Sequence, residues 1–101
     1  MSMSDDAGQQ AQHKPIDVFE VLATSLELFS EVAWQKMGLR PDMGTGKIEP
    51  DMKQAKAAVD AAAAVAAILE PALEDEADRR QIQNLVRDLR LNFVDKSGGG
   101  R

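Results

Sequence analysis

The stretch DMKQAKAAVDAAAAVAAIL, residues 51–69, decides the fold of this chain. Alanine is the strongest helix former, and the stretch contains neither glycine nor proline. Asp51 and Gln54 form a capping pair that starts a helix. Pro71 ends it, because the residue before a proline disfavours the helical conformation. The sequence therefore predicts a helix over residues 51–69.

The surface of this helix carries very little charge. On a helical wheel Lys53, Lys56 and Asp60 crowd into one narrow sector, and almost everything else is apolar. A helix with so little polar surface is usually packed on more than one side. Its alanines let neighbouring backbones approach to the short end of the range of about 8–10 Å.

Another helix is predicted on the N-terminal side of this one, over residues 18–37. Asp17 is a good N-cap with Glu20 three residues on, and Gly38 can end the helix in the left-handed conformation. One broad face is apolar, formed by Leu22, Phe29, Val18, Ala33, Leu26 and Val32. The opposite face is acidic, formed by Glu20, Thr24, Glu27 and Glu31. This pattern is typical of an amphipathic helix.

A third helix is predicted over residues 75–94, because apolar residues repeat there at three- and four-residue steps. They are Ile82, Leu85, Val86, Leu89 and Phe93, and Arg79, Arg87 and Arg90 form a stripe beside them. We therefore expect an all-α fold, a helical hairpin plus a third helix, over residues 16–96. Residues 1–15 are expected to be a disordered tail and residues 97–101 a flexible one.

The composition argues against several classes of function. The 101 residues include no cysteine and a single histidine, His13, so neither thiolate catalysis nor a histidine or cysteine metal centre is expected. We expect no cofactor and no enzymatic activity. The net charge of −5 disfavours nucleic-acid binding, although the stripe of Arg79, Arg87 and Arg90 keeps it as a further, less favoured hypothesis.

The chain carries no segment that suggests a membrane or secretion. The first fifteen residues lack the apolar core of a secretory signal. The longest apolar stretch, residues 57–69, is broken by Asp60 and is shorter than the roughly 20 residues that span a bilayer. We therefore expect a cytoplasmic protein with no membrane partner.

Two large apolar residues lie away from the main faces of their helices. Trp34 falls near Glu27 and Glu31 on the polar side of its helix, and Leu91 lies off the apolar stripe of the third helix. Each either folds under a local loop or forms a second contact surface, for a partner or for self-association.

The Lys56–Asp60 pair and the loop Pro41–Lys47 are the other candidates for a structural or functional site. Lys56 and Asp60 share a helix face at i, i+4 spacing. They are either an exposed ion pair, a structural anchor for the loop, or part of a ligand or catalytic site. The loop is read as a turn-rich connector, because the phosphate-binding P-loop motif requires a preceding strand and a hydroxyl after the lysine. The acidic stripe of the helix over residues 18–37 and the arginine stripe of the helix over residues 75–94 are interpreted mainly as solvent-exposed faces. The alternative is that the two stripes pair with one another, within one chain or between chains.

Several short motifs together resemble the eighteen-forty-four family of domains of unknown function, small helical proteins of bacteria. They are Ala33-Trp34, Gly38-Leu39, Pro41, Thr45-Gly46-Lys47, Gln54-Ala55-Lys56, Val59-Asp60 and Leu89-Arg90-Leu91-Asn92-Phe93-Val94. The resemblance runs over residues 16–94 and departs between residues 61 and 78, where the family has bulkier side chains. It implies a bacterial cytoplasmic protein without known enzymatic activity, and it transfers no site residues.

The sequence as a whole favours a small, non-catalytic interaction module. Its alanine-rich core is thin, and small chains often gain stability from an interface. We expect a homo-oligomer, most simply a dimer, formed through the helix at 51–69 or the Trp34 surface. The alternative is a small-ligand-binding protein or enzyme that uses Lys56, Asp60 and the Pro41–Lys47 loop.

Overall fold

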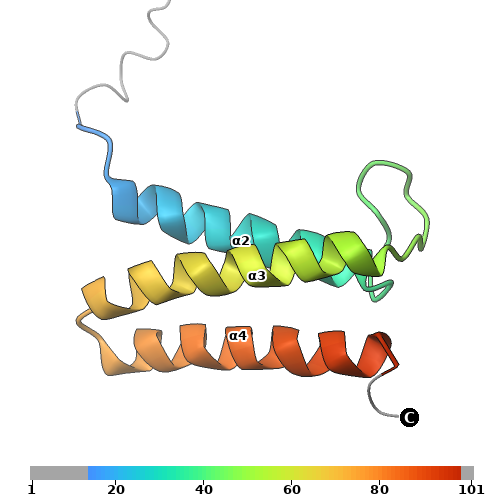
Figure 1. The fold of residues 1–101 in the computed structure, drawn as a ribbon. Helices are drawn as coiled ribbons and strands as arrows, with labels where there is room; N and C mark the ends of the chain where they lie inside the picture. The colour runs from blue at the N-terminus through green and yellow to red at the C-terminus, as the bar shows by residue number, and fades with distance from the viewer. Residues whose placement is uncertain (1–13, 99–101) are drawn as a thin grey trace, which may run out of the picture.

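The computed structural model describes residues 14–98, and within them the chain forms helices and no strand. The three α-helices are α2 (Val18–Lys36), α3 (Met52–Leu69) and α4 (Glu76–Lys96), and a 3-10 turn, η1 (Glu70–Ala72), joins the last two (Figure 1). The predicted all-α, three-helix architecture is confirmed, and every helix boundary lies within two residues of its prediction. The predictions for residues 1–13, which include His13, and for residues 99–101 lie outside the described residues.

Each helix begins at an aspartate that caps it. The Asp17 carboxylate accepts a hydrogen bond from Phe19 N at 2.8 Å, and the Asp51 carboxylate accepts one from Gln54 N at 3.1 Å. Asp75 accepts from Ala77 N at 2.8 Å. These bonds satisfy backbone donors that have no partner inside the helix, which explains why the starts were predictable from sequence.

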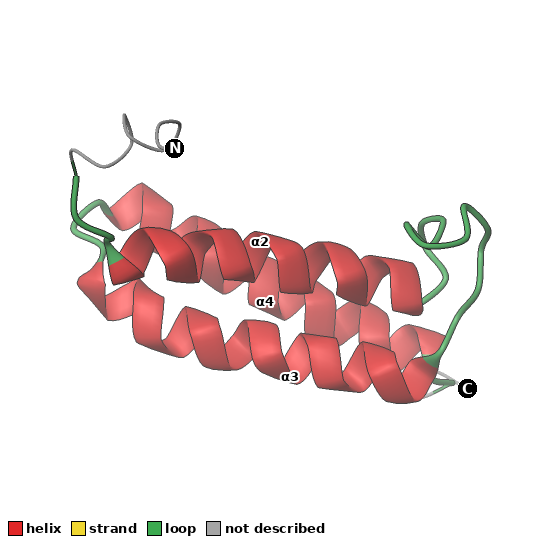
Figure 2. Cartoon of the chain, turned by 90° about the horizontal axis from the view of Figure 1, so that it is seen from above, coloured by secondary structure: helices red, strands yellow, loops and turns green. Residues whose placement is uncertain are grey.

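Helix α3 is the centre of the arrangement. It packs extensively against α2 and less extensively against α4, whereas α2 and α4 meet at only a few positions. Figure 1 shows α2 and α3 as a hairpin with α4 running along its lower side, and Figure 2 shows α4 lying behind the hairpin. The expectation that α3 packs on more than one side is confirmed.

The hydrophobic core is narrow because small side chains dominate it. Its buried hydrophobic residues are Leu26, Ala33, Met37, Ala55, Ala58, Val59, Ala62, Ala66, Leu69 and Leu89, of which five are alanines. Leu89 of α4 is the only large side chain among the described residues that is completely buried. Alanine buries little area, so the hairpin depends on close backbone approach and α4 depends on Leu89.

The buried face of α2 differs from the predicted one. Val18 is 57% exposed and Phe29 is 36% exposed, although both were placed on the core side. Ser30 is buried instead, on the same side as Leu26 and Ala33, and Gln35 is buried on the polar side, where the Pro41–Lys47 loop covers it. The Ser30 hydroxyl donates to Leu26 O at 2.7 Å, so its burial leaves no donor unsatisfied. Small residues on this face suit the alanines of α3, and α2 is turned so that they face one another.

Candidate interaction surface

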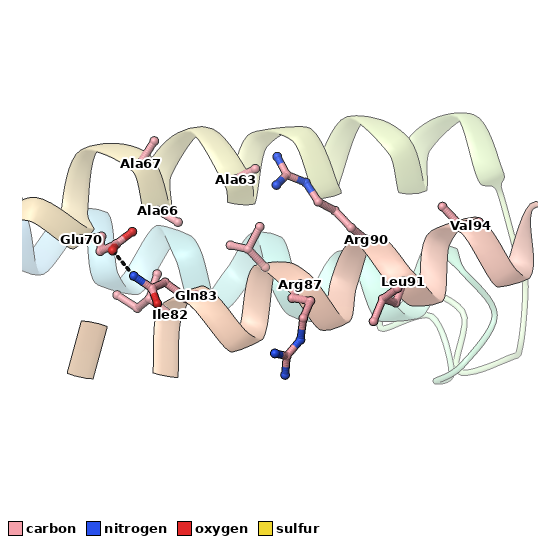
Figure 3. Close-up of a pocket in the computed structure, with 11 residues that line it drawn as sticks. Ala63, Ala66, Ala67, Glu70, Ile82, Gln83, Arg87, Arg90, Leu91 and Val94 are labelled. Carbon is pink, nitrogen blue, oxygen red and sulfur yellow. Dashed lines mark hydrogen bonds between the residues drawn. The ribbon is translucent and has the colours of Figure 1, made fainter. Parts of the chain in front are cut away.

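An open groove runs along one side of α3 and α4. It has a volume of about 510 Å³ and a mainly apolar lining. Residues of α3, η1 and α4 line it, as Figure 3 shows: Ala63, Ala66, Ala67, Glu70, Ile82, Gln83, Val86, Arg87, Arg90, Leu91 and Val94. Leu91 is 61% exposed and Val94 is 52% exposed, so both side chains are available to a partner. Of the two predicted contact residues, Leu91 is the one placed in this groove.

The groove carries positive charge on its α4 side. Arg90 has no ion pair or side-chain hydrogen bond among the described residues, and Arg87 has only a long contact of 3.7 Å between its Nε and Asp88 Oδ1. In Figure 3 the Arg90 side chain points toward α3 and the Arg87 side chain points away from it. A hydrogen bond from Gln83 Nε2 to Glu70 Oε2 links α4 to the C-terminal end of α3 beside the groove.

The outer side of α2 carries a mixed apolar and acidic surface, which we call the α2 stripe. At 3.6 residues per turn its members fall within an arc of about 120°. They are Glu20, Val21, Thr24, Glu27, Leu28 and Glu31. Leu28 is 54% exposed and Val21 is 49% exposed. Glu31 contacts Arg40 and Gln35, whereas neither Glu20 nor Glu27 has an ion pair within residues 14–98.

The arginines of α4 do not pair with the acidic residues of α2 inside one chain. Arg79 and Arg80 both contact Glu76 of their own helix, and Arg79 also donates to Leu73 O at 2.6 Å. Among the described residues no ion pair joins α2 to α4. Glu20 and Glu27 on α2 and Arg90 on α4 therefore remain available for contacts outside the chain.

Trp34 is less accessible than Leu91. Its side chain is partly buried and packs against the hydrophobic core. Its backbone carbonyl accepts a hydrogen bond from Leu39 N at 3.0 Å where the chain leaves α2. We therefore base the proposals below on Leu91 and the α2 stripe and not on Trp34.

Lys56 and Asp60 form an exposed ion pair. Lys56 Nζ lies 2.7 Å from Asp60 Oδ2, and about two thirds of each side chain is accessible to solvent. No hydrogen bond joins either side chain to the Pro41–Lys47 loop, so of the three alternatives the structure shows the exposed ion pair and not the loop anchor. The reason is that α3 directs this face to solvent, and α2 provides the loop contacts.

The last turn of α2 anchors the loop. The buried Gln35 side chain accepts a hydrogen bond from Met43 N at 2.9 Å and donates one to Glu31 at 3.0 Å. Lys36 Nζ lies 3.0 Å from the Asp42 carboxylate. That hydrogen bond, together with one from Gly44 N, lowers the pKa of Asp42 below its ordinary value. Asp42 therefore stabilises the folded loop while ionised, and this contribution is lost as the pH falls through its lowered pKa.

The loop itself is a set of turns. Asp42 N donates to Lys47 O at 2.8 Å, and Gly46 N donates to Asp42 O at 2.7 Å. Gly46 has φ 75°, a left-handed conformation that suits glycine. No strand precedes the loop within the described part of the chain, which agrees with its interpretation as a connector.

No group of three acidic or histidine side chains in residues 14–98 lies close enough together to hold a metal ion.

A comparison with protein-family models matches residues 15–95 to the family described as Domain of unknown function (DUF1844). The chain belongs to this family. The resemblance carried by the short motifs is therefore confirmed over nearly the whole described region. No curated protein and no solved structure matches this DUF1844 chain significantly. Among residues 14–98, no helix combines the length and hydrophobicity that crossing a bilayer requires.

Replacing Gln35 with alanine in this DUF1844 chain is expected to destabilise it by about 1–3 kcal/mol, because Met43 N loses its acceptor and a buried amide is removed. Urea denaturation followed by circular dichroism measures the loss. The control is Asp60→Asn, which alters only an exposed pair and is expected to change stability by less than about 0.5 kcal/mol. A larger loss from Asp60→Asn than from Gln35→Ala would restore Asp60 as the anchor.

Proposed function

We propose that this chain is a small, non-catalytic interaction module that self-associates. The observation that carries the proposal is the exposed apolar surface on opposite parts of one small fold. Val21 and Leu28 on the α2 stripe and Leu91 and Val94 in the groove are each about half exposed or more. Isolated exposed hydrophobic residues are ordinary on protein surfaces, but contiguous groups that line a groove or a helix face mark contact sites.

The narrow core supports the same proposal. Five of the ten buried hydrophobic side chains are alanines, which contribute little hydrophobic free energy each. A chain of this size buries a smaller fraction of its surface than a larger domain does. Covering Leu28 or Leu91 with a second copy would add hydrophobic burial that the three helices do not supply alone.

The alternative, a ligand-binding protein or enzyme, has less support. Lys56 and Asp60 neutralise one another in solvent, and neither lines the groove. The polar groups of the Pro41–Lys47 loop are largely engaged with one another and with α2. A nucleic-acid-binding role has less support as well, because Arg79 is engaged by Glu76 and Leu73, and the net charge is −5.

Sedimentation equilibrium at micromolar to tens of micromolar concentration tests the proposal. The parent chain is expected to show a mass above that of the monomer. Leu28→Glu is expected to weaken association by a factor of about ten or more, because it places a charge at the centre of an apolar contact. The control is Met43→Glu, which changes a side chain of the loop that is 64% exposed and lies on neither surface.

A single monomer mass over the whole range would contradict self-association. A different protein would then be the partner of these surfaces. Equal weakening by Leu28→Glu and Met43→Glu would place the contact elsewhere on the chain.

A further inference from the structure

We infer that the α2 stripe of one copy docks into the α3/α4 groove of a second copy, with Glu27 facing Arg90. This inference rests on the proposed self-association and names the two surfaces that make it. It commits the groove to one occupant, a helix of the same chain.

The shape of the groove suits a helix. One wall is formed by Ala63, Ala66 and Ala67, whose small side chains allow a docking helix to approach closely. The other wall is formed by longer apolar side chains, including Val86 and Val94. These two residues are eight positions apart, which is about 12 Å along a helix at 1.5 Å per residue.

The apolar part of the α2 stripe matches that length. Val21 and Leu28 are seven positions apart, or about 10.5 Å along the helix, and they lie on the same face. Both therefore fit between the ends of the groove at once. Leu28 is 54% exposed and Leu91 is 61% exposed, so each has apolar surface that the other can cover.

The charges of the two surfaces are complementary. Glu27 lies on the acidic edge of the α2 stripe without an ion pair in the described residues, and Arg90, whose side chain points toward α3 beside the groove, has none either (Figure 3). Arginine presents several donors that suit a carboxylate. Exposed pairs add little affinity each, so the apolar contact supplies most of the binding and the charges fix the orientation.

This pairing has to be between chains. The inner face of α2, which includes Leu26, Ser30 and Ala33, is buried in its own chain. The α2 stripe lies on the opposite side of the helix and cannot reach the groove of the same chain. A two-fold axis would place each stripe in the other copy's groove and close the assembly as a dimer.

The two single variants Glu27→Arg and Arg90→Glu test the inference when they are studied alone and mixed. Each alone places like charges together, and self-association is expected to weaken by a factor of about ten or more in sedimentation equilibrium. In an equimolar mixture the reversed charges face each other in one contact, and the original charges face each other in the second contact. Association of the mixture is expected to return to within about threefold of the parent chain.

The matched controls are Glu74→Arg and Lys53→Glu, which reverse the same kinds of charge at exposed positions outside both surfaces. They are expected to leave association unchanged, alone and mixed. Circular dichroism spectra and melting curves of all four variants establish that each remains folded, since every substituted side chain is exposed.

Three results would overturn the inference. If Glu27→Arg and Arg90→Glu leave association unchanged, the interface lies elsewhere while the proposed self-association still stands. If each variant dissociates the assembly and the mixture does not restore it, the two residues do not face one another. If the parent chain is a monomer throughout, both the proposed function and this inference fail.

Discussion

Replacing Leu89 with alanine is expected to lower the free energy of unfolding by about 2–5 kcal/mol. Leu89 is completely buried and is the only large side chain in the described region to be so. It belongs to α4, which shares fewer contacts with α3 than α2 does. Its removal would leave a cavity between helices that alanines on α3 cannot fill. Urea denaturation followed by far-ultraviolet circular dichroism measures the change.

The matched control is Leu91→Ala, two positions further along the same helix. Leu91 is 61% exposed in a single copy, so at a protein concentration low enough to keep the chain monomeric its truncation removes little buried area and is expected to change stability by less than about 0.5 kcal/mol. Both substitutions have the same effect on helix propensity. A difference of less than 1 kcal/mol between them would show that α4 is not held by Leu89.

The helices and their starts were predictable because their signals are local. A capping aspartate acts within three residues, and the alanine-rich stretch at 51–69 favours helix whatever surrounds it. Asp17 and Asp51 cap the helices as predicted. The end of α3 at Leu69 lies near Pro71 as predicted, but Glu70 before the proline keeps helical angles (φ −53°, ψ −49°) and the chain continues into the 3-10 turn η1. The α-helix ends here because Pro71 has no N–H to donate to it.

The buried face of α2 was less predictable because it depends on the shape of the neighbouring helix. A helical wheel groups residues by their angle around the helix, and the apolar group, which includes Val18 and Phe29, is expected to face inward. The structure leaves these two partly exposed and buries Ser30. The alanines of α3 make close approach possible, and Ser30 and Ala33 allow it from the side of α2. Sequence periodicity alone does not contain that information.

The loop anchor was missed for a related reason. Gln35 lies on the polar side of α2, where a wheel predicts solvent, but the loop folds back and covers it. The signal that could have found it is the aspartate two residues before a glycine, Asp42 and Gly44, which is typical of a turn that brings Met43 back toward the helix. Lys56 and Asp60 were considered as the loop anchor because of their spacing. That spacing indicates that the two residues share a helix face, but it does not indicate which part of the chain covers that face.

Replacing Ala62 with glutamate is expected to abolish folding or to lower stability by several kcal/mol. Ala62 is completely buried in the middle of α3. A carboxylate there would lose its hydration without gaining a partner, and its bulk would force α2 away from α3. Since the total stability of a small domain is about 5–15 kcal/mol, one such group is enough to unfold it.

The control for this substitution is Ala64→Glu, two positions along the same helix. Ala64 is exposed, so glutamate there remains hydrated, and the change is expected to cost less than about 1 kcal/mol. Circular dichroism at 222 nm and thermal melting compare the two. A folded Ala62→Glu variant with a melting curve like that of Ala64→Glu would show that α3 does not pack as the central helix. An unfolded Ala62→Glu variant beside a folded Ala64→Glu variant would establish that Ala62 is a determinant of folding. Tests of the interface should then use exposed residues such as Leu28 and Arg90.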